Sequence, residues 1–172
     1  MNKLIIFFTI LLSSNFTSNR VEKLIQKEVK SVFNIEAYSI ESIHVSEEIN
    51  ANLPVKITES NFVQVRVDKN LKGHYYVGKA FGKVDYFDFL VIFNEDLIVA
   101  KVKILVYREE HGGEIGSKRW LKQFIGKPSS KKLKYFEDIV GISGATLSAK
   151  ALTHEVNRVL KTVSELHSKK II

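Results

Sequence analysis

The sequence contains no cysteine among its 172 residues, and it has only two prolines and one tryptophan. The absence of cysteine excludes disulfides, thiolate metal sites, iron–sulfur clusters, thiol nucleophiles and the lipid-modified cysteine of a lipoprotein. Any catalytic chemistry therefore depends on oxygen and nitrogen groups or on a cofactor. With 26% charged and 45% hydrophobic residues, the sequence also lacks the composition of a polytopic membrane protein.

The composition is that of a globular domain with a moderate excess of positive charge. Lysine and arginine together number 26 against 19 aspartates and glutamates, which gives a net charge of +7. A basic balance raises the question of a nucleic-acid or anionic-surface partner. The cations are spread along the chain, however, and cluster locally only at residues 131–134 and 169–170. We therefore expect them to serve solubility, with no nucleic acid among the partners.

The first 18 residues have the pattern of a secretory signal peptide. Lys3 precedes an apolar run at residues 4–12, and a small polar stretch follows that run. The run is too short to span a bilayer, for which about 20 residues are needed. The alternative is a buried strand or helix of the fold. We predict a signal peptide at residues 1–18, a single domain at residues 19–172, and a location in the periplasm or on the outer face of the cytoplasmic membrane.

Apolar periodicity along the sequence predicts a helix before the strands of a sheet and further helices after them. Apolar residues recur at helical spacing between Val21 and Phe33. Strand-like segments follow at residues 62–67, 75–80, 85–93 and 97–107. A polar triplet at residues 94–96 implies a hairpin, whereas Pro54 indicates a loop or an edge strand within residues 35–60. This order predicts an α+β fold with a mostly antiparallel sheet flanked by helices.

The same patterns predict which side chains face the core. In the strand at residues 97–107 the core-facing set is Ile98, Ala100, Val102, Ile104 and Val106. Ser117 is expected to cap a short helix that ends at Gly126. A long C-terminal helix is expected to begin near Thr146. Its apolar stripe comprises Leu147, Leu152, Val156, Val159, Leu160, Val163 and Leu166.

Two glycine-containing loops that lead into the last two helices hold the candidate functional residues. In the second loop, Gly141 and Gly144 allow a ligand to approach the backbone closely, while Ser143 and Thr146 offer hydroxyl groups. The free amides and the positive dipole end of the following helix are suited to a phosphate. The alternative is a plain helix cap, in which the glycines only shape a turn.

The sequence Ser143-Gly144-Ala145-Thr146-Leu147 resembles the flavin-attachment motif of the FMN-binding domain family. That family includes the C subunit of the sodium-pumping NADH:quinone reductase and the G subunit of the related electron-transport complex. Its threonine carries FMN as a phosphoester, installed outside the cytoplasm by a Mg-dependent FAD:protein FMN transferase. The resemblance covers about residues 75–165 and implies FMN as the cofactor, Thr146 as the attachment residue and the transferase as a partner. The family usually has an acid where this chain has Val140, so covalent and noncovalent binding both stay open.

The first glycine-containing loop, at residues 107–120, resembles the His/Glu/Gly-rich stretch that follows the sheet in this family. The resemblance implies contacts to the flavin ring or its ribityl chain from Glu114, Ile115 and Gly116, with His111 close by. The first loop would then act together with the second, whose implied cofactor-binding residues are Ser143, Gly144, Ala145, Thr146 and Leu147.

Three residues after the first loop have open roles. Lys118 and Arg119 are candidate counter-charges for a reduced anionic flavin, and Trp120 either stacks on the ring or packs in the core. A metal site on this loop lacks a third ligand. A hydrolase built on Ser143 lacks the strand–turn–helix setting that a G-x-S-x-G nucleophile requires.

Together these features predict an exported FMN-binding flavoprotein that mediates electron transfer outside the cytoplasm. It would act as a carrier or as a flavin-dependent reductase, between a membrane-linked electron donor and an unknown acceptor. The alternative from another class is a non-redox exported module that binds an anionic ligand or a cell-surface polymer.

Overall fold

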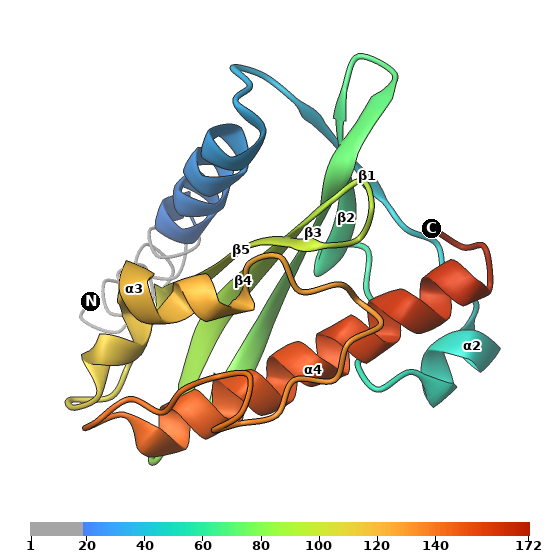
Figure 1. Cartoon of the computed structure of the whole chain (residues 1–172). Coiled ribbons are helices and arrows are strands. Elements are labelled where there is room, and N and C mark those ends of the chain that lie inside the picture. Colours follow the sequence, from blue (N-terminus) through green and yellow to red (C-terminus); the bar gives the residue numbers. More distant parts are fainter. Residues whose placement is uncertain (1–18) are drawn as a thin grey trace, which may run out of the picture.

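The structure, a computed structural model that describes residues 19–172, is an antiparallel sheet with a helix packed on each face. The sheet has five strands in the order β1-β2-β3-β4-β5, and every neighbouring pair is antiparallel (Figure 1). The predicted α+β class and the long C-terminal helix are therefore confirmed. The predicted signal peptide at residues 1–18 lies outside the described residues.

Each strand pairs with the next one along the chain, so the sheet is a simple meander. The strands are β1 (Ser39–Ser42), β2 (Phe62–Val67), β3 (Asn70–Phe81), β4 (Tyr86–Asn94) and β5 (Val99–Val106). The helices are a segment at residues 19–33, α2 (Glu47–Asn52), η1 (Gly113–Gly116), α3 (Lys118–Leu121), η2 (Lys122–Phe124) and α4 (Thr146–Ser168). Within residues 19–172, no helix combines the length and the hydropathy that crossing a membrane requires.

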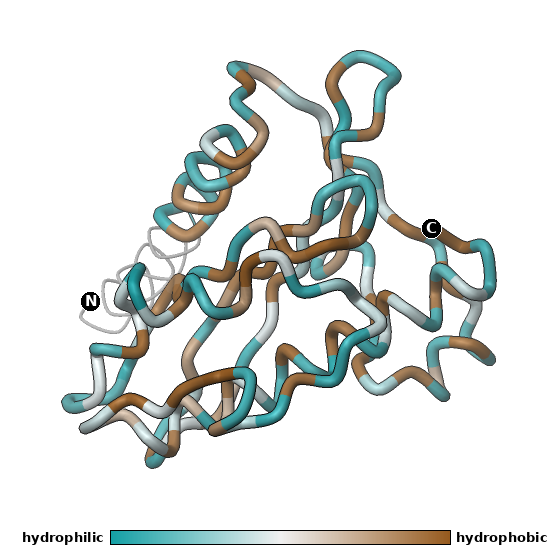
Figure 2. The backbone as a smooth tube through the Cα atoms, in the orientation of Figure 1, coloured by the Kyte–Doolittle hydropathy of each residue, from teal (hydrophilic) through white to brown (hydrophobic). Residues whose placement is uncertain are grey.

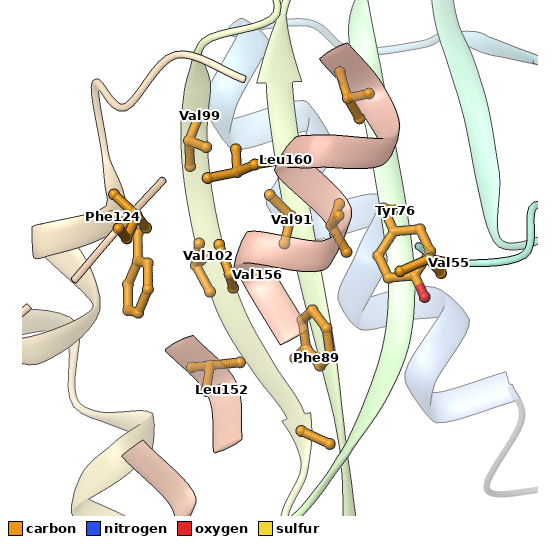
Figure 3. Close-up of a cluster of buried hydrophobic side chains, with 14 of the residues drawn as sticks. Val55, Tyr76, Phe89, Val91, Val99, Val102, Phe124, Leu152, Val156 and Leu160 are labelled. Carbon is orange, nitrogen blue, oxygen red and sulfur yellow. The ribbon is translucent and has the colours of Figure 1, made fainter. Parts of the chain in front are cut away.

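Helix α4 covers one face of the sheet and forms the main core with it. Its side chains Leu152, Val156 and Leu160 are at most 1% exposed and lie over Phe89 and Val91 of β4 (Figure 3). Hydrophobic residues recur along α4 between hydrophilic ones (Figure 2). Burying each of these aliphatic side chains contributes about 1.5–3 kcal/mol, so packing on the sheet is what fixes the position of α4.

The helix at residues 19–33 covers the opposite face of the sheet. Its Val29 is fully buried in a second cluster that includes Leu90 and Ile92 of β4. These two residues alternate along β4 with the residues that face α4. Because the middle of β4 is buried on both faces, residues 89–93 form a continuous apolar run, without the polar alternation of a half-exposed strand.

The predicted core face of β5 is correct only in the middle of the strand. The pairing shifts between Ile92 and Phe93 of β4, where Lys101 lies opposite the first and Val99 opposite the second. β5 therefore contains one extra residue, Ala100. The side chains that face the core have odd numbers before it and even numbers after it. Val99 is buried in place of Ile98 and Ala100, whereas Val102 and Ile104 face the α4 core as predicted. The prediction for Val106 is also wrong, because the pairing shifts again between Asp88 and Phe89 and leaves Val106 half-buried on the opposite face of the sheet, beside Tyr75.

Residues 35–60 contain the edge strand β1 and a loop at Pro54, in agreement with the loop or edge strand expected there. The short helix α2 was not expected, and its N-cap Ser46 accepts a bond from the Ile49 amide at 3.5 Å. One residue of α4 also differs from the sequence expectation. Leu147 was expected in the apolar stripe of α4 but is 53% exposed. It precedes Leu152 by five positions, which places the two side chains about 140° apart around the helix.

Candidate functional site

Three segments that are distant in sequence meet at the N-terminus of α4 (Figure 1). They are the β3–β4 turn, the first glycine-containing loop after β5, and the loop that leads into α4. A Cβ placed on Gly82 of the turn would lie 2.9 Å from the Glu109 carboxyl carbon and 3.1 Å from Ser148 Oγ. A Cβ on Gly112 would lie 3.3 Å from the Gly144 carbonyl oxygen. The structure thus brings together the two loops that the sequence singled out.

The N-terminus of α4 is open to an anion. The residue in the N-cap position is Ala145, which is 4% exposed and has no side chain that can cap the helix. Gly144 has a φ of +80°, a conformation that favours glycine. The side chains of Ser143 and Thr146 are exposed, and the Thr146 hydroxyl donates only a long 3.5 Å bond to the Ile142 carbonyl. The first-turn amides therefore lack a side-chain cap, and the expected alternative of a plain Ser/Thr cap does not describe this helix.

Exposed apolar side chains surround this loop. Val140 is 64% exposed, Leu147 is 53% exposed and Phe136 is 68% exposed. Phe136 leans against the loop, since a Cβ on Gly141 would lie 3.0 Å from its ring. Large apolar groups next to an open helix N-terminus offer a surface for the flat apolar part of a ligand whose anionic part binds the amides.

Contacts of Tyr107 and Gly112 hold the first glycine-containing loop against the start of α4. The Tyr107 hydroxyl donates to the His111 carbonyl at 2.9 Å and lies 3.1 Å from the hydroxyl of Ser148. Gly112 has a φ of +86°, and a Cβ there would lie 2.7 Å from the Tyr107 hydroxyl. The close approach of the two loops therefore depends on glycine at this position.

The predicted ring-contact residues occupy different environments. Glu114 and His111 are exposed, and a Glu114 carboxylate oxygen lies 3.9 Å from the position that a Cβ on Gly144 would take. Ile115 is fully buried in the main core, so only its backbone is available to a ligand. Gly116 has open space where a side chain would be. The contacts of these residues with a flavin stay predictions.

Helix α3 begins as predicted and anchors the loop before α4. Ser117 is its N-cap and accepts a bond from the Trp120 amide at 3.4 Å. Trp120 is 6% exposed and packs edge-on against Phe124 with ring centroids 5.4 Å apart. Its indole N–H donates to the Val140 carbonyl at 2.8 Å. Trp120 thus belongs to the core while its polar edge holds the loop.

Gln123 is a site residue that no local sequence pattern indicates. Its side-chain oxygen accepts a bond from the Val140 amide at 2.7 Å, and its side-chain nitrogen donates to the Trp120 carbonyl at 3.0 Å. Both backbone groups of Val140 are therefore held by side chains of the α3–η2 segment. A pair that is 17 positions apart gives no local signal, so only the folded structure reveals it.

A hollow of about 500 Å³ lies between α3 and the loop before α4. Its size falls within the range of about 300–1,000 Å³ that is usual for small-molecule sites. Its lining is Ser117, Arg119, Trp120, Gln123, Val140, Gly141, Ile142 and Ser143. Arg119 contributes a positive charge to the lining, and Lys118 is exposed beside it, while the role of either as a counter-charge stays a prediction. Among residues 19–172 no group of three histidines, aspartates or glutamates is close enough to hold a metal ion.

Together, the sheet, the open helix N-terminus and the adjoining hollow define a cofactor-binding α+β domain. Residues 82–161 match the FMN-binding domain, so the chain contains a domain of that family and FMN is its cofactor. The matched residues include the β3–β4 turn and both loops described above. The comparison with curated proteins gave no match.

The described residues fit FMN. Uncapped amides at the start of α4 suit its phosphate, and Gly144 provides a backbone that a ligand can approach closely. The hollow beside Ser143 and the exposed apolar groups suit a flat ring, and Arg119 adds a positive charge at its wall.

Proposed function

We propose that this chain is an exported flavoprotein that carries FMN on Thr146 and takes part in electron transfer outside the cytoplasm. The observation that carries the proposal is the exposed Thr146 hydroxyl on the first residue of an uncapped helix. The FMN-binding domain match over residues 82–161 supplies the identity of the cofactor. The motif Ser143-Gly144-Ala145-Thr146 supports attachment at this hydroxyl.

The proposed attachment is a phosphoryl transfer to Thr146. Its Oγ1 forms a bond to the phosphorus of the FMN half of FAD, the pyrophosphate bond breaks, and AMP leaves. The hydroxyl proton passes to a base of the FAD:protein FMN transferase, because a threonine hydroxyl is a weak nucleophile without activation. Apart from its weak bond to Ile142, the hydroxyl of Thr146 makes no hydrogen bond within the described part of the chain. It is therefore available to an external enzyme.

The residues around Thr146 have separate proposed roles. The amides of the first turn of α4 stabilise the phosphate, and the carbonyl and amide of Val140 keep the preceding loop in place. The exposed side chains of Val140 and Leu147 shield one side of the ring from water. FMN supplies an acceptor for one or two electrons, and the protein orients it and adjusts its electronic properties.

Export is proposed from the pattern of residues 1–18, with Lys3 before an apolar run at residues 4–12. The transferase, a membrane-linked electron donor and an acceptor outside the cytoplasm are the proposed partners. Fractionation of an expressing bacterium, with the mass of the protein in each fraction, tests this part. A full-length protein found only in the cytoplasm would contradict it.

Intact mass spectrometry tests the attachment. The wild type, Thr146→Ala and the control Ser130→Ala, which removes an exposed hydroxyl outside the site, are each coexpressed with the transferase in an exporting host. We expect a mass gain of one FMN minus one water in the wild type and in Ser130→Ala, and no gain in Thr146→Ala. A gain in Thr146→Ala overturns the assignment of the residue. A yellow colour that is lost on denaturation, without a mass gain, shows noncovalent binding.

A further inference from the structure

The Glu109 carboxylate is bound by the backbone of the β3–β4 turn. Its Oε1 accepts bonds from the amides of Val84 at 3.0 Å and Asp85 at 3.4 Å, and a short bond from the amide of Lys83. Gly82 leaves the room for this carboxylate, because a Cβ there would lie 2.9 Å from the Glu109 carboxyl carbon. Turn and carboxylate thus fit one another, and they are 24 to 26 positions apart in sequence.

The carboxylate is held in its charged form. Desolvation raises the pKa of Glu109, but the backbone bonds from Val84, Lys83 and Asp85 outweigh this and lower the pKa below its ordinary value. A charged acceptor makes stronger hydrogen bonds than a neutral one. The bond between the turn and the loop therefore persists at neutral pH.

A second set of contacts holds the same loop against α4. Tyr107 bonds the His111 carbonyl and contacts Ser148 of α4, as described above. Gly112 lies against Gly144, with 3.3 Å between its Cβ position and the Gly144 carbonyl oxygen. In sequence, Glu109 lies between the end of β5 and these contacts. Gly112 and Glu114, which follow it, lie beside Gly144 of the Ser143–Thr146 loop.

We infer that Glu109 is a positioning residue of the flavin site, which holds residues 111–116 against the attachment loop through the β3–β4 turn. The inference rests on the proposed function, because it assumes FMN on Thr146. Glu109 itself is directed to the turn amides, and within residues 19–172 its side chain makes no hydrogen bond to the attachment loop. Its effect on FMN is therefore exerted through the loop.

The experiment compares Glu109→Ala, Glu109→Gln and Gly82→Ala with a matched control, Glu110→Ala. The control removes the same charge from the next residue, which is exposed and makes no hydrogen bond or ion pair within residues 19–172. For each protein loaded by the transferase, we measure the rate of FMN incorporation, the flavin midpoint potential and flavin fluorescence. Thermal melting of the unloaded proteins checks that each variant folds.

We expect Glu109→Ala to lose FMN incorporation several-fold and to shift the midpoint potential and the fluorescence, while Glu110→Ala matches the wild type. Glu109→Gln keeps an acceptor oxygen and should recover most of the wild-type behaviour. Gly82→Ala displaces the carboxylate without removing its charge and should resemble Glu109→Ala. If Glu109→Ala does not fold, Gly82→Ala and Glu109→Gln decide the question.

Two results overturn the inference. One is wild-type incorporation, potential and fluorescence in both Glu109→Ala and Gly82→Ala. The other is an equal change in Glu110→Ala, which would show a general effect of charge. A wild type that takes up no FMN on Thr146 contradicts the proposed function instead, so the two failures are distinguishable.

Discussion

Acid should destabilise the fold through one buried histidine, His74 of β3. This residue is 2% exposed, and its ring stacks on Phe62 with centroids 5.6 Å apart. Neither ring nitrogen has a hydrogen-bond partner in residues 19–172. Burial, and to a lesser extent the charge of Arg66, lower the pKa of His74 from 6.5 to about 4. The histidine is therefore neutral in the folded state at neutral pH.

The size of this acid destabilisation follows from the difference between the pKa of His74 in the unfolded chain and in the folded chain. The unfolded chain binds a proton at His74 below pH 6.5, whereas the folded chain resists it until about pH 4. His74 therefore does not lower the free energy of unfolding above pH 6.5. As the pH decreases from 6.5 toward 4 its effect grows, and below pH 4 the effect increases no further. At about 1.4 kcal/mol per pKa unit, His74 alone lowers the free energy of unfolding by about 3 kcal/mol at acid pH. That is a large share of the roughly 5–15 kcal/mol that stabilises a typical domain.

Urea unfolding followed by circular dichroism between pH 4 and 7 measures this effect. His74→Leu removes the titrating group and keeps the site apolar, so its free energy of unfolding should fall less than that of the wild type over the same range. The difference between the two proteins should reach about 3 kcal/mol. The control His154→Gln changes an exposed histidine and should keep the wild-type slope. Equal slopes for His74→Leu and the wild type would refute the reasoning.

Two further predictions concern the loop before α4 and the main core. Gln123→Leu removes the bonds to the Val140 amide and the Trp120 carbonyl, so it should lower the free energy of unfolding by about 1 kcal/mol and slow FMN incorporation several-fold. Mass spectrometry and urea unfolding check both effects, and wild-type incorporation would contradict the role of this residue. Leu160→Ala should cost about 2–5 kcal/mol because its side chain is 1% exposed in the core. The same truncation at Leu147, which is 53% exposed, should cost less than about 0.5 kcal/mol in urea unfolding.

The sheet and the last helix were predictable because their signals are local. The polar triplet at residues 94–96 lies between two apolar runs, and the structure has a β4–β5 hairpin there. The shift at Ala100 was not predictable, because an extra residue in one strand leaves the apolar pattern intact until the partner strand is known. The exposure of Leu147 was within reach, since five positions from Leu152 do not fit a helical stripe.

The candidate site was predictable only as two loops. Glycines and hydroxyls near Thr146 mark an open helix N-terminus, and the structure has one without a side-chain cap. The contacts that hold the loops in place join distant residues. Gln123 bonds to Val140, and Glu109 bonds to the β3–β4 turn more than 20 positions earlier in the chain. Such pairs depend on the register of the sheet and on the position of α3 in the fold, and no local sequence pattern encodes either of these.

Three exposed residues of the site are each next to a residue that is buried in the core. Ala145 is 4% exposed and precedes Thr146, and Ile115 is fully buried and follows Glu114. Ile139, also fully buried, precedes the exposed Val140. Because neighbouring residues share a backbone, packing of the buried partner fixes the place of the exposed one without a contact of its own. The structure can therefore leave the side chain of Thr146 exposed and still present it in one position, since the main core beneath it supplies the rigidity.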